Sequence, residues 1–409
     1  MDKRVVVTGL GVITPLGLTV EDFWEGLISG RNGIGYITLF DASAYPVKTA
    51  AEVKGFDPKK YMDEKMVDRT LRFTQFAIAA ARMAINSAGL DPSKEPDKVG
   101  VVIATTGEII NVGEQAEIVK TRGPRRVDPL LISKIAAHMA PVHVGLIIGA
   151  KGPNSTINSA CASGSDALGV ALEHLRRGRV EVMIAGGSDA MVSPLVLAST
   201  GLVGALSRQP DPNKASRPFD LHRDGFIIGE GAGIMVLETY EHAVKRGASI
   251  LAEFAGVGWS FDAYNETAPD PQGEALAMRA AIKDAGIRPE EIDYINAHGT
   301  STKLNDIAET QAIKIVLGGH AYKIPISSNK SMIGHLMAAG GAVEAVATVL
   351  TISRGIIPPT INYETPDPQC DLDYVPNEAR QAEVNCCLSN SFGIGGQNCC
   401  LIFKRFAEK

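Results

Sequence analysis

No apolar run in this sequence is long enough to cross a membrane, because even the stretch 338–352 carries Glu344. Positive charge is also scarce: 46 Asp and Glu outnumber 40 Lys and Arg and leave a net charge of −6. Such a balance argues against a general nucleic-acid-binding protein. With 45% apolar and 21% charged residues, we expect a globular protein whose partners include neither a membrane nor a nucleic acid.

Motifs for zinc and disulfide chemistry are missing too. The six cysteines show no zinc-ligand spacing, and four of them form the adjacent pairs Cys386-Cys387 and Cys399-Cys400. Neighbours on a strand point to opposite faces, so we expect reduced core residues in a cytoplasmic protein. The start of the chain only weakly resembles a signal peptide, because the β-branched residues from Val5 predict a strand and a turn.

Nucleotide-binding motifs are absent as well. Gly9-Leu10-Gly11 lacks the third glycine of a dinucleotide-binding fingerprint. The glycines within 225–233 are spaced two apart among apolar residues, which favours close backbone packing in a strand over phosphate binding. We therefore expect no nucleotide cofactor and, given the missing zinc spacing, no metal.

What is present is an alternation of helices and short apolar strands, the pattern of a layered α/β fold. A chain of 409 residues is long for one domain. It also contains two internal repeats. Residues 73–104 resemble residues 274–297, and the helix after Cys161 resembles the helix after His335. The sequence thus predicts two similar halves that divide near residue 250. The predicted halves are 1–250 and 251–409.

The stretch 158–178 predicts a strand end, a tight turn and an amphipathic helix. Cys161 falls at the start of that helix, where free N–H groups and the helix dipole lower the pKa of a thiol. The small residues Ala160, Ala162 and Gly164 leave space around the sulfur. A lone cysteine in an apolar segment is more often a small core residue, so its assignment as a nucleophile depends on partners elsewhere in the chain.

Two histidine segments supply such partners. His298 follows a predicted strand end, where α/β proteins place their chemistry. Lys330 and His335 stand at the head of another helix. Each histidine alone is more often structural than catalytic. Together with Cys161 they provide a thiolate, two imidazoles and a cation, which is a complete set for acyl transfer through a thioester.

These motifs resemble those of the elongating β-ketoacyl-acyl carrier protein synthases, most closely synthase II, over essentially the whole chain. The Cys-His-His set is distinctive, because the initiating synthases carry Asn at the second His position and the thiolases carry a second Cys. The resemblance implies the thiolase fold, a five-layered αβαβα sandwich of two similar halves, in a homodimer. The matching segments are 5–11, 159–164, 216–220, 298–302, 329–335 and 390–393.

The resemblance also implies a decarboxylative condensation. Cys161 takes an acyl chain from acyl carrier protein, and backbone N–H groups of Cys161 and Ile394 hold the oxyanion. His298 and His335 then stabilise the enolate that forms when malonyl-acyl carrier protein loses carbon dioxide, without a metal or redox cofactor. Lys330 orients and charge-balances the site. The implied supporting residues are Glu344, Asp306 and Glu309 as partners of Lys330, Phe392 beside the site, and Thr300 and Thr302 for the pantetheine arm.

The implied partner, acyl carrier protein, is acidic, and a local basic patch is enough to steer it towards a chain of negative net charge. Arg125 and Arg126 are the strongest candidates because they are adjacent in a loop bounded by glycine and proline. A single arginine is otherwise most often a solvated surface charge. The predicted patch consists of Lys65, Arg69, Arg125, Arg126 and Arg208.

Three positions depart from the family pattern. Ile394 replaces a phenylalanine that gates the acyl pocket, Gln397 stands where threonine is common, and Glu108 replaces an apolar residue of the acyl channel. An ionised carboxylate in an apolar tunnel is costly, so Glu108 either turns outward or meets a polar group. The alternatives to fatty acid elongation are a specialised polyketide or unusual acyl pathway, and a non-catalytic partner similar to a chain-length factor, against which the intact Cys161 counts.

Overall fold

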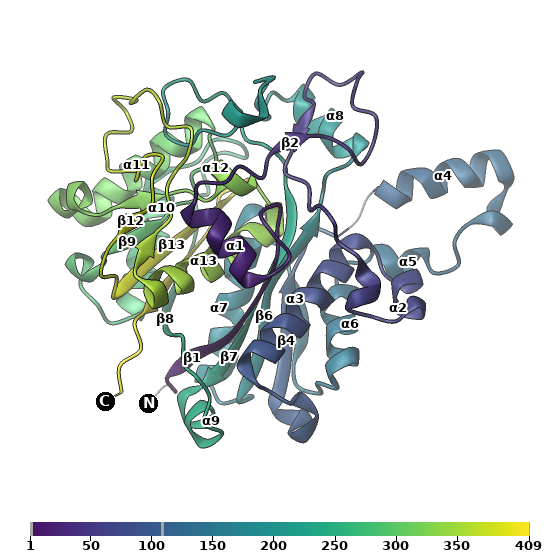
Figure 1. Cartoon of the computed structure of the whole chain (residues 1–409), viewed down its shortest axis with the longest axis horizontal. Helices are drawn as coiled ribbons and strands as arrows, with labels where there is room; N and C mark the ends of the chain where they lie inside the picture. Colours follow the sequence, from purple (N-terminus) through teal and green to yellow (C-terminus); the bar gives the residue numbers. More distant parts are fainter. Residues whose placement is uncertain (1–2, 108–109, 409) are drawn as a thin grey trace.

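The computed structural model of the protein describes residues 3–107 and 110–408. The strands of its main sheet are β1 (Val5–Ile13), β4 (Val99–Ala104), β5 (Asn154–Ile157), β6 (Val182–Ala190), β7 (Glu230–Thr239), β8 (Ala252–Phe261), β9 (Tyr294–Asn296), β10 (Ile326–Ser327), β13 (Cys386–Gly393) and β14 (Gln397–Lys404). Across the described residues these ten strands follow the order β10-β9-β13-β14-β8-β1-β7-β6-β4-β5 (Figure 1). Two short ladders lie outside it: β2 (Gly35–Tyr36) with β3 (Thr49–Ala50), and β11 (Ile356–Ile357) with β12 (Arg380–Gln381).

The main sheet consists of two five-stranded halves with one pairing pattern. In the first half β7 runs antiparallel to β1 and β6, whereas β6, β4 and β5 are parallel. In the second half β14 runs antiparallel to β8 and β13, whereas β13, β9 and β10 are parallel. The two halves meet where Val6 and Val7 of β1 pair with Glu253 and Ala252 of β8. This topology confirms an α/β fold built from two similar halves.

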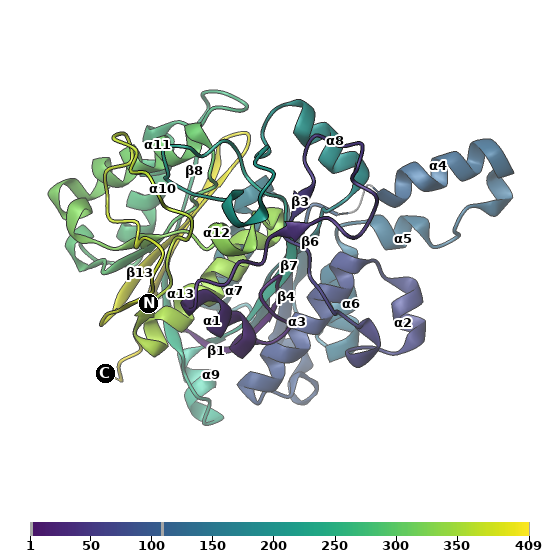
Figure 2. The ribbon, with the colours of Figure 1, turned by 45° about the horizontal axis from the view of Figure 1, so that its top comes forward.

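Helices complete five layers (Figure 2). On the outer face of the first half lie α3 (Arg72–Ala88) and α6 (Met139–Ile148), and the second half is covered by α10 (Pro271–Asp284) with α11 (Lys303–Leu317) packed against it. Between the halves lie α7 (Ser163–Arg176) and α13 (Gly340–Arg354), whose apolar faces join one core with both half-sheets. The remaining helices are α1 (Val20–Ile28), α2 (Glu64–Arg69), α4 (Ile110–Arg122), α5 (Leu131–Ile135), α8 (Pro194–Leu202), α9 (Tyr240–Lys245) and α12 (Lys330–Ile333).

The two central helices cross at close range because a glycine removes the side chain from their contact. A Cβ atom on Gly164 of α7 would lie 2.6 Å from the backbone nitrogen of Ala342 on α13, which is closer than side chains approach backbone. The crossing brings the turn before α7, which contains Cys161, next to the 3₁₀ turn Met337–Ala339 before α13. The packing of small residues thereby assembles the site.

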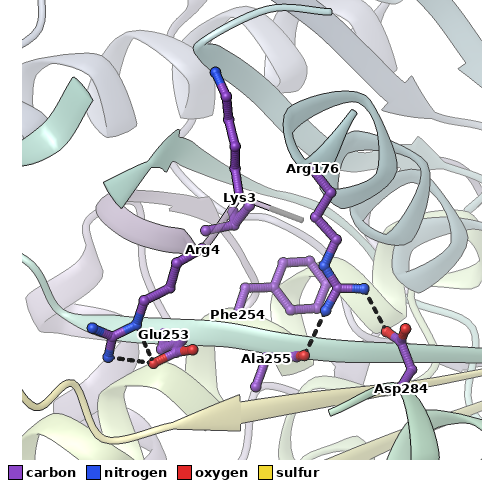
Figure 3. A pocket seen from close by; sticks show the side chains of 8 residues that line it. Lys3, Arg4, Arg176, Glu253, Phe254, Ala255 and Asp284 are labelled. Carbon is purple, nitrogen blue, oxygen red and sulfur yellow. Dashed lines mark hydrogen bonds and ion pairs between the residues drawn. The ribbon is translucent and has the colours of Figure 1, made fainter. Parts of the chain in front are cut away.

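Ion pairs tie the two halves together near the chain termini (Figure 3). Arg4 from the first half pairs with Glu253 at 2.5 Å. Arg176 at the end of α7 pairs with Asp284 of α10 at 2.7 Å and donates to the carbonyl of Ala255 at 2.6 Å. These groups line a hollow of about 310 Å³. Both arginines of the hollow are paired with carboxylates of the other half. The hollow is therefore part of the junction between the halves.

An arm formed by α4 and α5 extends away from the body of the protein (Figures 1 and 2). Its two helices are connected through the 3₁₀ turn Pro124–Arg126. The arm carries exposed apolar side chains, of which Ile132 is 74% exposed and Val119 44% exposed. Exposed apolar residues gathered on an extended segment are typical of a surface that another chain covers.

The structure confirms several local predictions. The expected strand 99–104 coincides with β4. All six cysteines are free. On β13 and β14 the adjacent pairs alternate as expected, since Cys387 and Cys399 belong to the central core and Cys386 and Cys400 to the outer one. Among the described helices, none combines the length and the apolar character needed to cross a membrane.

Candidate active site

Cys161 lies in a tight turn between β5 and α7. β5 ends at Ile157, a 3₁₀ turn covers Ala160–Ala162, and α7 begins at Ser163. The Ser163 hydroxyl fixes the turn by donating to the carbonyl of Ala160 at 2.5 Å and accepting the N–H of Ser159 at 2.8 Å. The predicted turn is therefore confirmed, but Cys161 lies within the short 3₁₀ turn before α7 instead of opening the helix.

The pKa of Cys161 is raised, contrary to the prediction. Although the residue as a whole is half-buried, desolvation of its sulfur raises the pKa of the thiol. This effect outweighs the N–H groups of Ile394 and Cys161 and the charge of Lys330, which lower the pKa. A helix end favours a thiolate only if the sulfur is not also withdrawn from water. The thiol is the resting form, and two backbone N–H groups face it.

His298 and His335 converge on this sulfur from the other half of the protein. His298 follows β9, and His335 lies between α12 and α13. Their ring centroids are 5.5 Å apart at an angle of 86°, and the ring of Phe392 packs 5.8 Å from that of His298. One nitrogen of each histidine and the sulfur of Cys161 all lie within 4.8 Å of one another. Three of the four residues predicted to be catalytic thus form one cluster, and the fourth, Lys330, lies behind His298.

The groups behind the two imidazoles determine where each ring carries its hydrogen. Nδ1 of His335 accepts the backbone N–H of Met337 at 3.0 Å. Nδ1 of His298 lies 3.3 Å from Nζ of Lys330, and an ammonium group can only donate. Burial, together with the charge of Lys330, holds the pKa of both histidines well below the usual range. Both rings are therefore neutral, and their Nε2–H groups are left to donate to a substrate.

Lys330 is held by a single carboxylate. Its ammonium donates to Oε1 of Glu344 at 2.5 Å, and both side chains are buried. A buried ion pair of this kind depends on both members, because either charge alone would lack a partner in a medium that solvates it poorly. Glu344 is thus confirmed beside Lys330, as an anchor that keeps the ammonium behind His298.

Asp306 and Glu309 do not contact Lys330, which corrects their predicted role. Glu309 instead accepts the backbone N–H groups of His298 at 2.8 Å and of Gly299 at 2.7 Å. Asp306 accepts the N–H of Thr300 at 3.1 Å. The two carboxylates of α11 therefore shape the turn that carries His298. The sequence places both carboxylates on α11. It does not show that their hydrogen-bond donors are backbone N–H groups of the turn at 298–300, because that contact depends on how the turn packs against α11.

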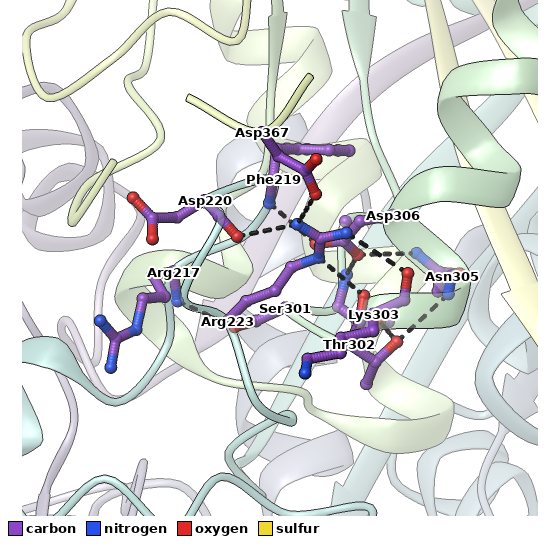
Figure 4. A network of polar contacts seen from close by, with 12 residues as sticks. Arg217, Phe219, Asp220, Arg223, Ser301, Thr302, Lys303, Asn305, Asp306 and Asp367 are labelled. Atoms are coloured by element: carbon purple, nitrogen blue, oxygen red, sulfur yellow. Dashed lines mark hydrogen bonds and ion pairs between the residues drawn. The ribbon is translucent and has the colours of Figure 1, made fainter. Parts of the chain in front are cut away.

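A buried arginine, which the sequence analysis missed, extends this support (Figure 4). Arg223 donates to the carbonyl of Thr302 at 3.1 Å, and it pairs with Asp367 at 2.7 Å and with Asp306 at 3.4 Å. The hydroxyls of Thr300 and Thr302 lie 2.8 Å apart in the same segment. No sequence spacing links an arginine at 223 to aspartates at 306 and 367, so only the folded chain reveals the network.

Asp189 near the end of β6 is a second residue that the sequence analysis missed. It is fully buried and accepts the hydroxyl of Thr106 at 2.7 Å and the N–H of Ala338 at 3.0 Å. Burial raises the pKa of Asp189 to about 7. It connects the end of the β4 segment with the turn that follows His335. A lone acidic residue at a strand end gives no signal that would have identified it.

The predicted acyl-pocket residues are only partly described. Ile394 lies in the turn between β13 and β14 with its side chain 62% exposed, while its neighbour Phe392 is buried. Glu108 lies outside the described residues, so its predicted orientation stays a prediction.

The predicted basic patch comes from three separate elements, and all five side chains are exposed. Lys65 and Arg69 lie on α2. Arg125 and Arg126 lie at the turn of the arm, and Arg208 follows α8.

The Cys161, His298 and His335 cluster has the ligand types and spacing of a zinc site, but its surroundings do not fit a metal ion. A metal-binding histidine offers a lone pair to the metal and donates its other N–H to an acceptor behind it. Behind these two rings stand the donors Lys330 and Met337, so the lone pairs lie on Nδ1 and the hydrogens on Nε2. The cluster is arranged to donate hydrogen bonds.

Comparison with known proteins agrees with this arrangement. Residues 2–243 match the family described as "Beta-ketoacyl synthase, N-terminal domain". Residues 251–364 match the family described as "Beta-ketoacyl synthase, C-terminal domain". The chain is 49% identical to 3-oxoacyl-[acyl-carrier-protein] synthase 2 of Synechocystis sp., over 99% of this chain and 98% of that protein.

Solved structures are similar as well. The ishigamide ketosynthase/chain length factor matches with a TM-score of 0.94 and 39% identity, over 100% of both chains. A type II polyketide synthase acyl carrier protein in complex with its ketosynthase bound to the hexaketide matches with a TM-score of 0.91 and 39% identity, over 99% of this chain and 100% of the other.

A thiolase fold that joins a half-buried cysteine to two hydrogen-donating histidines defines a condensing enzyme. This chain belongs to the β-ketoacyl synthase family, and among its members it is similar to the 3-oxoacyl-[acyl-carrier-protein] synthases 2.

Proposed function

We propose that the protein condenses malonyl-acyl carrier protein with an acyl chain held on Cys161, giving 3-oxoacyl-acyl carrier protein in fatty acid elongation. The observation that carries this proposal is the meeting of one thiol with two neutral imidazoles that keep Nε2–H free. The 49% identity to a 3-oxoacyl-[acyl-carrier-protein] synthase 2 over nearly the full length supports elongation as the pathway.

In the first half-reaction, the sulfur of Cys161 attacks the thioester carbon of an acyl-acyl carrier protein. The N–H groups of Cys161 and Ile394 face that sulfur and are suited to hold the oxyanion of the tetrahedral intermediate. As the intermediate collapses, the pantetheine sulfur leaves and takes up the proton that Cys161 loses. The exchange of one thioester for another consumes no net proton and leaves the acyl chain on the enzyme.

In the second half-reaction, the thioester carbonyl of the malonyl group accepts the Nε2–H groups of His298 and His335. The bond to the carboxylate breaks, carbon dioxide leaves, and the electron pair becomes an enolate whose oxygen the two donors stabilise. The enolate carbon attacks the acyl group on Cys161, and the sulfur departs as a thiolate when the new carbon–carbon bond forms. The thiolate then takes up a proton from water, which restores the resting thiol. Lys330 positions His298 in this scheme and transfers no proton, because its ammonium is paired with Glu344.

The proposal also includes a binding site for the pantetheine arm and a docking surface for acyl carrier protein. Thr300 and Thr302 carry hydroxyls in the segment next to His298, where they can hydrogen-bond the pantetheine arm. We infer that acyl carrier protein docks on the exposed patch of Lys65, Arg69, Arg125, Arg126 and Arg208, an inference supported by the ketosynthase of similar structure in complex with its carrier protein.

The nucleophile gives the most direct test. After incubation with an acyl-acyl carrier protein, mass spectrometry of proteolytic peptides should find the acyl group on Cys161. The Cys161→Ala variant should carry no acyl group and show no condensation, while its thermal midpoint stays close to wild type because a small side chain is replaced by another. Condensation near the wild-type rate in that variant would refute the mechanism.

A specialised polyketide or unusual acyl pathway is the second candidate. It is favoured by the structural match to polyketide ketosynthases and by Ile394 and Glu108, which depart from the family pattern at the acyl pocket. Turnover of Glu108→Ile across saturated chain lengths separates the two. A gain on medium and long chains supports the specialised pocket, and an unchanged profile supports ordinary elongation. The intact catalytic cluster argues against a non-catalytic partner.

We further infer that the protein works as a homodimer in the cytoplasm without a cofactor. Among the described strands β5 is an edge with β4 as its neighbour, and the arm beyond the body carries exposed apolar residues such as Ile132. A second copy would cover both features. Six free cysteines support a reducing compartment. The proposed steps use only side chains and backbone N–H groups of this chain.

A further inference from the structure

A second cluster with metal-ligand spacing lies away from the catalytic residues. One carboxylate oxygen each of Glu95 and Glu181 and one ring nitrogen of His242 lie within 4.8 Å of one another. Glu95 belongs to the segment before β4, Glu181 immediately precedes β6, and His242 lies on α9, which follows β7. These are the strand ends opposite to those that face the active site, and α9 lies at the bottom of Figure 1.

The imidazole of His242 is oriented as a metal ligand. Its side chain is only 10% exposed, and Nδ1 lies 2.5 Å from a carboxylate oxygen of Glu238. Glu238 is itself ion-paired with Arg246 at 2.5 Å, so it acts as an acceptor. Nδ1 therefore carries a hydrogen, and Nε2, the nitrogen left to bind a metal, lies 3.5 Å from a carboxylate oxygen of Glu95. A carboxylate behind the ring is the usual support of a histidine that binds a metal.

This arrangement is the reverse of the one at the active site. Behind His298 and His335 stand hydrogen-bond donors, which place the ring hydrogens on Nε2. Behind His242 stands an acceptor, which leaves the lone pair of Nε2 available. Two carboxylates and one such imidazole form a ligand set that suits zinc and neighbouring divalent transition metals, with positions left for water.

A cation already occupies the space between the two carboxylates. Nζ of Lys98 lies 3.1 Å from Glu95 and 3.2 Å from Glu181. Oε2 of Glu95, the oxygen that faces Lys98, is also the one that lies 3.5 Å from Nε2 of His242. The Lys98 side chain is 41% exposed and attached by a flexible stem, so it can move into water when a divalent ion takes its place.

We propose that Glu95, Glu181 and His242 form a binding site for a divalent transition metal ion, in which the metal replaces the ammonium of Lys98. The bound ion links the segments that lead into β4 and β6 with α9 behind β7. Because these segments lie at the end of the sheet away from Cys161, the ion stabilises the fold and takes no part in condensation.

Zinc titration of the full-length protein tests the proposal. We would use the Cys161→Ala variant as the parent, so that the catalytic thiol cannot bind zinc, and measure heat of binding and the thermal midpoint. One zinc per chain should bind and raise the midpoint. Glu95→Gln and His242→Asn should each weaken binding by at least about tenfold. Glu95 is partly exposed, so its variant keeps the test valid if His242→Asn fails to fold.

Two further variants distinguish a built site from a general attraction to acidic residues. Lys98→Met should tighten zinc binding by about tenfold, because it removes the competing cation. Glu241→Gln, a change on the exposed face of the same helix α9, should leave the affinity unchanged. The absence of saturable binding to the parent, binding that survives both ligand substitutions, or an affinity unaffected by Lys98→Met would each overturn the proposal.

Discussion

At the scale of single residues, the chemistry of each imidazole follows from the group behind it. His298 and His335 accept hydrogen bonds at Nδ1 and so present Nε2–H, whereas His242 donates at Nδ1 to Glu238 and has Nε2 facing Glu95. The sequence shows only three histidines, but the hydrogen-bonding arrangement of His242 is the reverse of that of His298 and His335. What distinguishes them is the hydrogen-bonding partner that the fold supplies.

Glu309 is the residue whose exchange should disturb His298 most without touching the substrate. Its two oxygens accept the N–H groups of His298 and Gly299 and the amide of Asn390. In Glu309→Gln one acceptor becomes an N–H donor that faces these donors. We expect a loss of about 1–3 kcal/mol in unfolding free energy and a large drop in malonyl decarboxylation.

The measurements are urea unfolding and the rate of carbon dioxide release. Glu290→Gln, at an exposed position on the 3₁₀ turn Pro289–Glu291, serves as the control and should change neither. Equal behaviour of the two variants would mean that the turn holds His298 without Glu309.

Asp189 should make the stability of the protein depend on pH. Its pKa is about 7 in the folded protein and about 3.9 in an unfolded chain, so the folded form binds the proton more tightly. This carboxyl therefore favours folding at acidic pH, and its contribution is lost as pH rises from about 4 through about 7. Asp189→Asn has no such titrating group. As pH rises across this window, the free energy of unfolding of the variant should therefore increase relative to that of wild type by up to ~4 kcal/mol.

Unfolding midpoints of both proteins between pH 5 and pH 8 provide the measurement. The difference between the midpoints of the variant and of wild type should change with pH up to pH 7 and become constant above it. Asp97→Asn, at an exposed position, is the control and should run parallel to wild type. Parallel curves for Asp189→Asn would show that the buried carboxyl does not change its ionisation between pH 5 and pH 8, which contradicts the prediction.

At the scale of elements, the crossing of α7 and α13 should tolerate no added atom. In Gly164→Ala the new Cβ would meet the backbone of Ala342 and Ala338, so the helices must separate. We expect a loss of about 1–3 kcal/mol in stability and lower condensation, because Cys161 and His335 sit next to this crossing. Gly113→Ala on α4 is the matched control, since a Cβ there meets nothing within 4 Å.

The control should be neutral or more stable by up to about 1 kcal/mol, because alanine favours helices more than glycine does. Differential scanning calorimetry and the condensation rate decide the comparison. If both variants behaved alike, the close crossing would not be what holds the site together.

Elements with a strong periodic pattern could be predicted from the sequence, and contacts between distant segments could not. The strand 99–104 was located to the residue because it is short, apolar and bounded by polar loops. The turn of Cys161 was predicted, but the burial of its sulfur depends on packing from the other half. Arg223, Asp189 and the His242 cluster have partners far away in the chain, so no local spacing could reveal them.

At the scale of the whole molecule, charge distribution matters more than total charge. Arg125→Glu combined with Arg126→Glu should raise the apparent KM for carrier-protein substrates by about tenfold at low salt, and hardly change that for acyl-pantetheine. The effect should shrink as salt rises, because screening weakens exposed charges.

Lys94→Glu combined with Lys283→Glu makes the same change in net charge at exposed positions elsewhere, and it should affect neither substrate. Steady-state kinetics at several salt concentrations compare the two pairs. An equal rise in KM for both substrate types would assign the arginines a structural role.

The shared central layer also bears on how the protein is made. During synthesis the first half-sheet and α7 leave the ribosome first, yet the side of α7 that faces away from this half-sheet packs against α13, which emerges later. At ordinary elongation rates, roughly 5–20 s pass between the emergence of β8 and that of α13. For that interval a large apolar face stays open to water, so nascent chains of this enzyme should depend on chaperones that shield it until residue 354 has emerged.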